Sequence, residues 1–463
     1  MSIEAVLSRI DAGLDASLGR LFDLVRIKSI STDPAFAEEV RRGAEWCAAE
    51  LAGIGFEASV RQTAGHPMVV AHWRGKVARE APHVLFYGHY DVQPVDPIEL
   101  WATDPFEPRI ETRADGAKQI VGRGTADDKG QLLTFVEAAR AFVAETGGLP
   151  CRVTVLLEGE EESGSPSLDA FLLENKAELS HDVALVCDTN MWDAKTPAIT
   201  ATLRGLVGEE VTITAADRDL HSGLFGGPAL NPIRVLAKIL AELHDETGRV
   251  TLPGFYDGVS ELPAEVKASW DGLGLTADAF LKPYGLSTPA GEQGRSVLEQ
   301  LWARPTCEFN GITGGYTGEG FKTVLPAKAT VKVSFRLVGD QDPAKIRASF
   351  RAFVEARLPK DAKASFHPHG GSPGLALPFD SPWLATAKAA LTAEWGVPAV
   401  LIGGGGSIPV VGRFKTMLGM DTALVGFGLD DDRIHSPNEK YDLTSFHGGI
   451  RSWARILDAL AQG

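Results

Sequence analysis

Residues that can bind metal ions occur in several separate segments of this chain, and many of them follow short apolar runs. His89 and Asp91 lie in GHYD, and Asp188 lies in VCD. Zinc accepts both imidazole nitrogen and carboxylate oxygen as ligands, and two ions held about 3.5–4 Å apart can activate a water molecule and stabilise a developing oxyanion. The further candidates, from GRGTADDKG, EGEEESGS and DRIHSPNE, are Asp127, Asp128, Glu160, Glu161, Glu162 and His435.

Each of these residues has an ordinary alternative role when it is considered alone. Asp188 could form a turn, and Asp127 or Asp128 could cap the helix that follows. Three successive glutamates often form a solvated face, and His435 could be a surface or packing residue. The joint pattern favours a metal site, because ligands of wound α/β sheets gather beyond the carboxyl ends of the strands. Asp91, two residues after His89, could then fix the tautomer of that imidazole.

The remaining histidines give weaker signals. His367 and His369 form an H-x-H pair, but Pro368 between them and the lack of nearby acidic residues favour an ordinary surface strand. The glycine run at 403–406 precedes Ser407 without the Lys-Ser/Thr of a P-loop, so phosphate binding is disfavoured. No supporting group of residues was found in the sequence for His66, His72, His83, His181, His244 and His447.

Apolar periodicity predicts an α/β fold that would position the candidate ligands. Short β-rich runs are expected at 83–92, 152–160 and 182–188, with helices at 130–145 and around 166–178 between them. This alternation of strand and helix is typical of a wound sheet. Further helices are expected at 3–27, 34–53, 381–396 and 444–461.

A change of pattern near Arg204 predicts an inserted domain. The strands expected there are at 209–217, 329–338 and 362–370, and the helices at 231–246 and 342–358. The chain is therefore divided into a discontinuous catalytic domain, residues 1–203 and 375–463, and an inserted domain, residues 204–374. The role of the helical, Trp- and Pro-containing stretch at 255–305 does not follow from its sequence.

Composition limits the class of protein and its partners. The 463 residues carry 45 Lys and Arg against 61 Asp and Glu, a formal net charge of −16, which disfavours nucleic acid and anionic membranes as partners. The sequence has no apolar run of the roughly 18 residues that a membrane span needs. Four widely spaced cysteines, Cys47, Cys151, Cys187 and Cys307, fit buried thiols in a reducing compartment. We therefore expect a cytoplasmic protein.

The motifs taken together resemble a known family. GHYDVQPV, GRGTADDKG, EGEEESGS, VCD, DLHSG and IHSPNE, in this order, resemble the metallopeptidases that include carnosinase, carboxypeptidase G, succinyl-diaminopimelate desuccinylase and acetylornithine deacetylase. WATDPFEP and GGYTGEGFKTVLP place the resemblance closest to the carnosinase-like dipeptidase branch. The resemblance implies a wound mixed-sheet α/β catalytic domain with helices on both faces and an inserted α+β lid and dimerisation domain.

The resemblance also implies roles for individual residues. Two divalent ions are expected, zinc first and manganese or cobalt as alternatives. His89 and Asp188 would bind one ion. Glu162 and His435 would bind the other, and Asp127 would bridge the two. Glu161 would act as general base, since the following S-G-S fixes the family's glutamate pair at Glu161 and Glu162. The implied metal ligands are His89, Asp127, Glu162, Asp188 and His435, and the implied catalytic residues are Glu161, Asp91 and His221. The bond between Asp127 and Asp128 is often cis in this family.

Substrate contacts are expected mainly from the inserted domain. By resemblance, His221 would reach the active site of a partner subunit and support the oxyanion, which implies a homodimer joined through the inserted domain. Arg336 would grip a substrate carboxylate, a group that suits the bidentate geometry of arginine. The weaker candidates for substrate binding are Asn310, Thr323, Gly405 and Ser407.

These observations predict a di-metal amide hydrolase. The leading expectation is a dipeptidase or related exopeptidase that cleaves substrates with a free carboxylate, by way of a water molecule between the ions that Glu161 deprotonates. The first alternative is an N-acyl amino acid deacylase or desuccinylase with the same metal centre. The second is an inactive metal-binding scaffold. The sequence does not give the side-chain preference, the physiological metal or the pathway.

Overall fold

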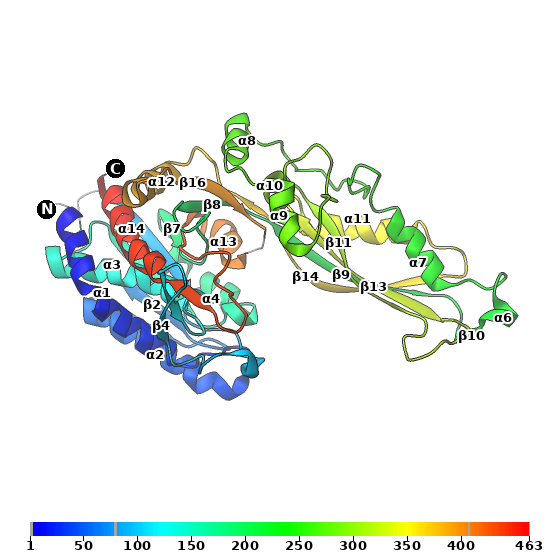
Figure 1. Cartoon of the computed structure of the whole chain (residues 1–463), viewed down its shortest axis with the longest axis horizontal. Coiled ribbons are helices and arrows are strands. Elements are labelled where there is room, and N and C mark those ends of the chain that lie inside the picture. The colour runs from blue at the N-terminus through cyan, green and yellow to red at the C-terminus, as the bar shows by residue number, and fades with distance from the viewer. Residues whose placement is uncertain (1–2, 78–80, 406–407, 463) are drawn as a thin grey trace. The chain divides into compact units, whose positions relative to one another are not determined.

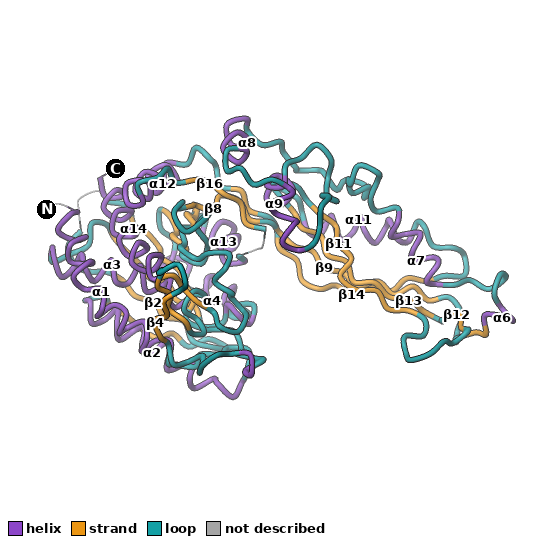
Figure 2. The backbone as a smooth tube through the Cα atoms, viewed as in Figure 1, coloured by secondary structure: helices purple, strands orange, loops and turns teal. Residues whose placement is uncertain are grey.

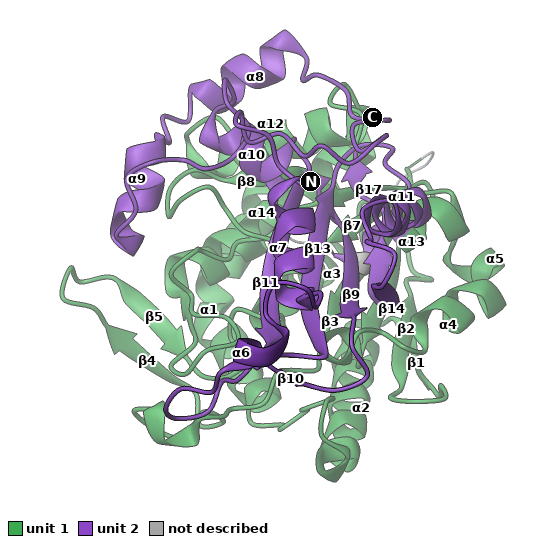
Figure 3. Ribbon diagram, turned by 90° about the vertical axis from the view of Figure 1, so that its right-hand side faces the viewer, with its two compact units in different colours: residues 1–201, 377–402, 413–463 green, residues 202–376, 403–412 purple. Residues whose placement is uncertain are grey.

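The computed structural model describes residues 3–77, 81–405 and 408–462 (Figure 1). The chain forms two compact units, coloured separately in Figure 3. The first unit comprises residues 1–201, 377–402 and 413–463, and the second unit comprises residues 202–376 and 403–412. The boundaries drawn from the sequence differ from these by two residues at each junction, and residues 403–412 group with the second unit. The functional division into catalytic and lid domains stays a prediction.

A mixed sheet forms the centre of the first unit. Its strand order in this unit is β1-β2-β6-β3-β7-β17-β8. The central strand β3 (His83–His89) runs parallel to both of its neighbours, β6 (Arg152–Glu158) and β7 (Val183–Val186). Burial is nearly continuous along these strands, as expected for parallel strands that are covered on both faces. The other strands are β1 (Glu57–Arg61), β2 (Met68–His72), β17 (Asp421–Leu424) and β8 (Ala198–Leu203).

Helices cover both faces of this sheet. Phe86 of β3 stacks on Phe135 with ring centroids 3.8 Å apart and meets the ring of Trp453 edge-on at 5.7 Å. Successive strand residues face opposite ways, and the next residue, Tyr87, lies 5.7 Å from the ring of Phe414. The predicted fold class is therefore confirmed. The helices that carry these rings are α3 (Lys129–Thr146), α14 (Leu443–Gln462) and the π-helical turn Phe414–Leu418, and the other long helices are α1 (Ile3–Val25), α2 (Ala37–Ile54) and α12 (Pro382–Trp395).

The second unit is built on an antiparallel sheet of order β11-β13-β9-β14, whose long strands run side by side in Figure 2. The strands β9 (Gly205–Thr214), β13 (Lys328–Leu337) and β14 (Lys363–Ser372) were predicted. The fourth, β11 (Thr306–Gly314), was missed, because it is largely exposed and a bulge between Phe309 and Gly311 breaks its alternation.

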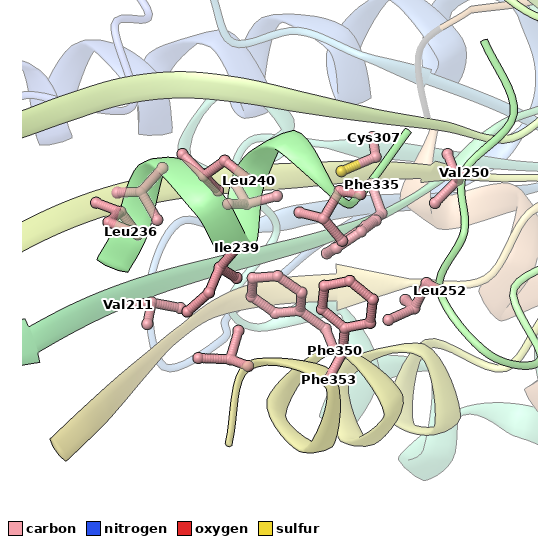
Figure 4. Packing of buried hydrophobic residues seen from close by; sticks show 14 of the residues in the cluster. Val211, Leu236, Ile239, Leu240, Val250, Leu252, Cys307, Phe335, Phe350 and Phe353 are labelled. Carbon is pink, nitrogen blue, oxygen red and sulfur yellow. The ribbon is translucent and has the colours of Figure 1, made fainter. Parts of the chain in front are cut away.

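Helices α7 (Pro232–Ala241) and α11 (Pro343–Glu355) pack their apolar residues on this sheet (Figure 4). Phe335 of β13 and Phe350 of α11 are fully buried, with ring centroids 5.2 Å apart. Burial of one such side chain contributes about 1.5–3 kcal/mol, so this core fixes both helices to the strands. The 255–305 stretch contains the short helices α8 (Ala264–Asp271), α9 (Ala277–Leu281) and α10 (Val297–Trp302).

The structure describes all four cysteines, and each is buried and free. Within the described part of the chain, no helix has the length and apolar character that would let it cross a lipid bilayer.

Candidate metal centre

The carboxyl ends of the central strands bring the predicted ligands together. In the described ranges 3–77, 81–405 and 408–462, two groups of side chains have ligand atoms that all lie within 4.8 Å of one another. Both groups contain Asp127, so one carboxylate is shared. The first group is His89, Asp127 and Asp188, and the second is Asp127, Glu162 and His435.

His89 is oriented from both sides of its ring. It is the last residue of β3 and is fully buried. Its Nδ1 lies 3.1 Å from the backbone oxygen of Asp91 and 3.4 Å from Oδ1 of the same residue, so Nδ1 carries the hydrogen. The lone pair of Nε2 then faces Asp127 Oδ1 at 3.1 Å and Asp188 Oδ2 at 3.8 Å.

His435 makes the matching contacts in the second group. Its Nε2 lies 2.9 Å from Asp127 Oδ2 and 3.2 Å from Glu162 Oε2. The Nε2 atoms of the two imidazoles therefore face different oxygens of the same aspartate. The peptide bond between Asp127 and Asp128 is cis, and Asp128 accepts the backbone N–H of His89 at 3.0 Å.

The three successive glutamates have different environments. Glu160 is buried and accepts the backbone N–H groups of His66 and Ser167, so it has a structural role. Glu162 belongs to the second ligand group. Glu161 begins the short 3-10 helix Glu161–Ser163, directly beside that ligand.

The electrostatics indicate that negative charge is concentrated at the two ligand groups. Burial raises the pKa of Glu161 to about 8; the charge of His89 opposes this rise and that of Asp188 adds to it. Burial also raises the pKa of Asp188 well above its usual value, and the charge of Asp127 adds to the rise. Hydrogen bonds to Asp127 and Glu162 raise the pKa of His435 to about 10. For His89, burial alone would lower the pKa, but hydrogen bonds to Asp127 and Asp91 raise it well above 6.5.

This donor set fits divalent ions. A lone pair that faces carboxylate oxygens is repulsive unless a proton or a metal ion lies between them, and both histidines are in that situation. Nitrogen and oxygen donors of this kind suit zinc, and carboxylates also suit manganese. A cation at each group would offset the neighbouring negative charges that add to the raised pKa of Glu161 and Asp188.

The predicted substrate residues lie in the second unit. His221 is exposed, and its Nδ1 accepts the N–H of Gly223 at 3.0 Å, which leaves Nε2–H as a donor in the neutral ring. Thr323 is next to it, since its backbone oxygen accepts the N–H of Ser222. Asn310 lies at the bulge of β11, and Arg336 lies on β13 opposite Leu206. Gly405 accepts a hydrogen bond from Arg204, and Ser407 lies outside the described residues.

Sequence reasoning missed one residue that bonds to a metal ligand and one that bonds to a predicted substrate residue. Gln93 donates its side-chain amide to Glu162 Oε2 at 2.7 Å. Arg204 donates to the backbone oxygen of Gly405 at 3.1 Å, and burial together with the charge of Arg336 lowers its pKa to about 10. Gln93 lies in a recognised motif, GHYDVQPV, which could have drawn attention to it; the sequence gives no comparable signal for Arg204.

One expectation about the other histidines was wrong. His72 Nδ1, His83 Nε2 and His181 Nε2 all lie 2.9–3.0 Å from Thr154 Oγ1. The rings of His83 and His181 stack with centroids 3.4 Å apart. These residues form a constellation at the opposite ends of the strands from the ligand groups, and the sequence did not reveal it because each lies in a different segment.

Comparison with known proteins gives consistent relatives. Residues 85–459 match peptidase family M20/M25/M40. The Cys-Gly metallodipeptidase DUG1 of Saccharomyces cerevisiae is 30% identical, over 98% of this chain and 98% of its own. The Beta-Ala-His dipeptidase of Homo sapiens is 30% identical, over 99% of this chain and 93% of its own. The solved structure of an M20 family metallo-carboxypeptidase from Sulfolobus solfataricus superposes with a TM-score of 0.81 at 29% identity, covering 96% of this chain and 99% of that chain.

Proposed function

This chain belongs to peptidase family M20/M25/M40, and from that premise we propose that it is a metal-dependent dipeptidase that hydrolyses short peptides with a free carboxylate. One observation carries the proposal: two ligand groups share Asp127, and Glu161 lies beside them. The relatives named as dipeptidases support a dipeptide as substrate. We propose zinc as the ion at both groups, with manganese and cobalt as the alternatives to test.

The chain's own residues divide the work of hydrolysis. His89, Asp188, Asp127, Glu162 and His435 would hold two ions, which when bound supply Lewis-acid polarisation of the carbonyl and a lowered pKa of water. Glu161 takes the proton from the attacking water and gives it to the leaving amine. A carboxylate suits both steps, because it accepts the proton as a base in the first and returns it as an acid in the second.

We propose that residues of the second unit contribute to binding. His221 offers an Nε2–H donor to the oxyanion, because Nδ1 is already engaged by Gly223. Arg336 binds the substrate carboxylate, and Asn310, Thr323, Gly405 and Ser407 are secondary contacts.

We also propose a homodimer through this unit, which exposes large apolar side chains, among them Leu224, Ile312 and Phe321 at 76%, 62% and 92%. Free buried cysteines favour a reducing, cytoplasmic compartment.

The test replaces the proposed base without removing a metal ligand. Purified Glu161→Gln is assayed on a panel of dipeptides and N-acyl amino acids, with zinc, manganese or cobalt added. We expect metal content equal to that of the unaltered protein and a turnover of dipeptides reduced by at least about 100-fold. Near-normal turnover would remove Glu161 from the mechanism. Faster cleavage of N-acyl amino acids than of dipeptides by the unaltered enzyme would favour the deacylase alternative.

The proposed dimer has a separate test. Inactive His221→Ala and inactive Glu161→Gln proteins are mixed and allowed to exchange subunits. If His221 acts in the partner's site, mixed dimers contain one complete site and regain part of the activity. Mixtures that exchange subunits but stay inactive would contradict the role of His221 across subunits.

A further inference from the structure

We propose that Glu439 is a positioning residue of the metal centre, which fixes the segment of Asp127 to the segment of His435. The proposal rests on the function proposed above. We call residues 122–128 the Asp127 loop and residues 432–440 the His435 loop. Glu439 is the last residue of the IHSPNE motif, but none of the roles assigned so far uses its side chain.

The carboxylate of Glu439 is completely buried, and within the described residues all of its hydrogen bonds are to the Asp127 loop. Its Oε1 accepts the backbone N–H groups of Ala126 at 2.9 Å and Asp127 at 3.1 Å. Its Oε2 accepts the N–H of Gly124 at 3.0 Å and Nη1 of Arg123 at 2.7 Å. Both oxygens are thus saturated by donors from one short segment, and one of these donors is the backbone of the shared ligand.

The main chain of Glu439 adds a further bond. Its backbone oxygen accepts the N–H of Gly122 at 3.0 Å, at the start of the Asp127 loop. Glu439 therefore contacts this loop at both ends. Backbone N–H groups that are buried need such acceptors, and here a single residue provides them for four positions of an irregular segment.

The His435 loop needs an anchor of this kind. His435 has a φ of 59°, in the left-handed region that ordinary residues seldom adopt, and its side chain is 54% exposed. The loop is closed at its base, where the N–H of Lys440 donates to the backbone oxygen of Asp432 at 2.9 Å and Lys440 Nζ lies 2.6 Å from its carboxylate. Glu439 directly precedes Lys440 in the chain, so its bonds to the Asp127 loop link the base of the His435 loop to Asp127.

A purely structural role would predict a loss of stability and nothing else. The geometry indicates more, because the ligand atoms of Asp127 and His435 come from the two loops that Glu439 joins. His89 and Asp188 are on other segments, and His89 is oriented by Asp91 and Asp128. Loss of Glu439 should therefore lower the affinity for the ion at Asp127, Glu162 and His435 more than the affinity for the ion at His89, Asp127 and Asp188. Changes in residues that support metal ligands typically lower affinity 10- to 100-fold.

The experiment measures metal affinity in Glu439→Gln by competition with a chelator, using zinc alone as the probe. The matched control is Glu209→Gln, since Glu209 is also buried and bonded to two arginines, Arg347 and Arg351, in the second unit. In Glu439→Gln an amide NH2 must face backbone donors. We expect one of the two ions to bind 10- to 100-fold more weakly, with activity restored by excess zinc, and Glu209→Gln to bind both ions within about twofold of the unaltered protein.

A folded Glu439→Gln that binds both ions as the unaltered protein does would overturn the proposal. If that variant does not fold, hydrogen exchange on the unaltered holoenzyme tests the proposal. Protected amides at Gly124, Ala126 and Asp127 would support their bonding to Glu439, and exchange at the rate of an open loop would refute it. The unaltered protein separates this inference from the function on which it rests. If it binds fewer than two ions or cleaves no dipeptide, the proposed function fails and this inference fails with it.

Discussion

Replacement of Asp91 by asparagine should weaken metal binding although the side chain keeps its size. Asp91 is fully buried and touches both ligand groups. Its Oδ2 accepts the N–H of Glu162 at 3.0 Å, and its Oδ1 lies 3.4 Å from His89 Nδ1, which carries a hydrogen. Both neighbours are donors, and asparagine presents one oxygen and one NH2 to them in place of two oxygens.

The size of the effect follows from this mismatch. With its NH2 toward Glu162, asparagine leaves that backbone N–H without an acceptor; with its NH2 toward His89, it opposes the Nδ1–H, which then keeps only the backbone oxygen at position 91 as an acceptor. A buried donor without an acceptor costs about 1–3 kcal/mol, and about 1.4 kcal/mol corresponds to a factor of ten. The affinity for zinc should therefore fall by up to about 150-fold.

The assay is a zinc titration against a chelator of known affinity, followed by dipeptide hydrolysis at rising zinc concentration. Asp182→Asn is the control, because Asp182 accepts a single backbone N–H, that of His83 at 2.7 Å, which the asparagine oxygen can also accept. If Asp91→Asn is folded and its zinc affinity stays within about twofold of the control, the assignment of Asp91 as the support of His89 and Glu162 is refuted.

Three further predictions concern stability. Removal of the ions with a chelator should lower the melting temperature, because an ion at a free concentration of 100 times its Kd adds about 2.7 kcal/mol to the free energy of unfolding. An unchanged melting temperature would contradict the binding of metal ions to the folded state. Burial lowers the pKa of His83 and His181 to about 4, so the unfolded state binds more protons between about pH 4 and 6.5, and the free energy of unfolding should rise as the pH is raised through that window, by at most about 1.4 kcal/mol per pH unit for each histidine. Denaturant titrations at several pH values should show a shallower slope in His83→Gln/His181→Gln, and an equal slope would contradict the pKa shifts. Phe350→Ala should cost about 3–5 kcal/mol by denaturant unfolding, because Phe350 is fully buried against Phe335; a cost below 1 kcal/mol would show that the core of the second unit rearranges.

Local pattern was enough to predict most of the fold. Helices such as α3 and α14 and strands such as β9 were predicted because their apolar residues repeat with the period of the element, and β3 was predicted because it is a short continuous run of apolar, β-rich residues. β11 was missed for the opposite reason, since most of its residues are exposed and its alternation is interrupted at the bulge. Periodicity reports burial, and a strand that buries little gives little signal.

The candidate ligands were also accessible from the sequence. His89 and Asp188 directly follow apolar strands, and the carboxyl ends of neighbouring parallel strands lie at one edge of the sheet. The expectation that they converge with Asp127 required only this rule and the resemblance to a family. Which of the three glutamates faces the centre followed from the motif, and the structure gives Glu160 its own set of backbone donors.

The supporting contacts were decided by the tertiary structure. Glu439 and Asp127 are 312 residues apart in the chain, and His72, His83 and Thr154 belong to three different strands. A buried carboxylate or imidazole bonds to whichever donors the folded backbone places within about 3 Å, and neither residue type nor spacing records that placement. The sequence by itself determined which elements form and which residues end them. Only the packed chain decided which side chains hold those ends in position, because such partners are set by distances between segments that local periodicity does not encode.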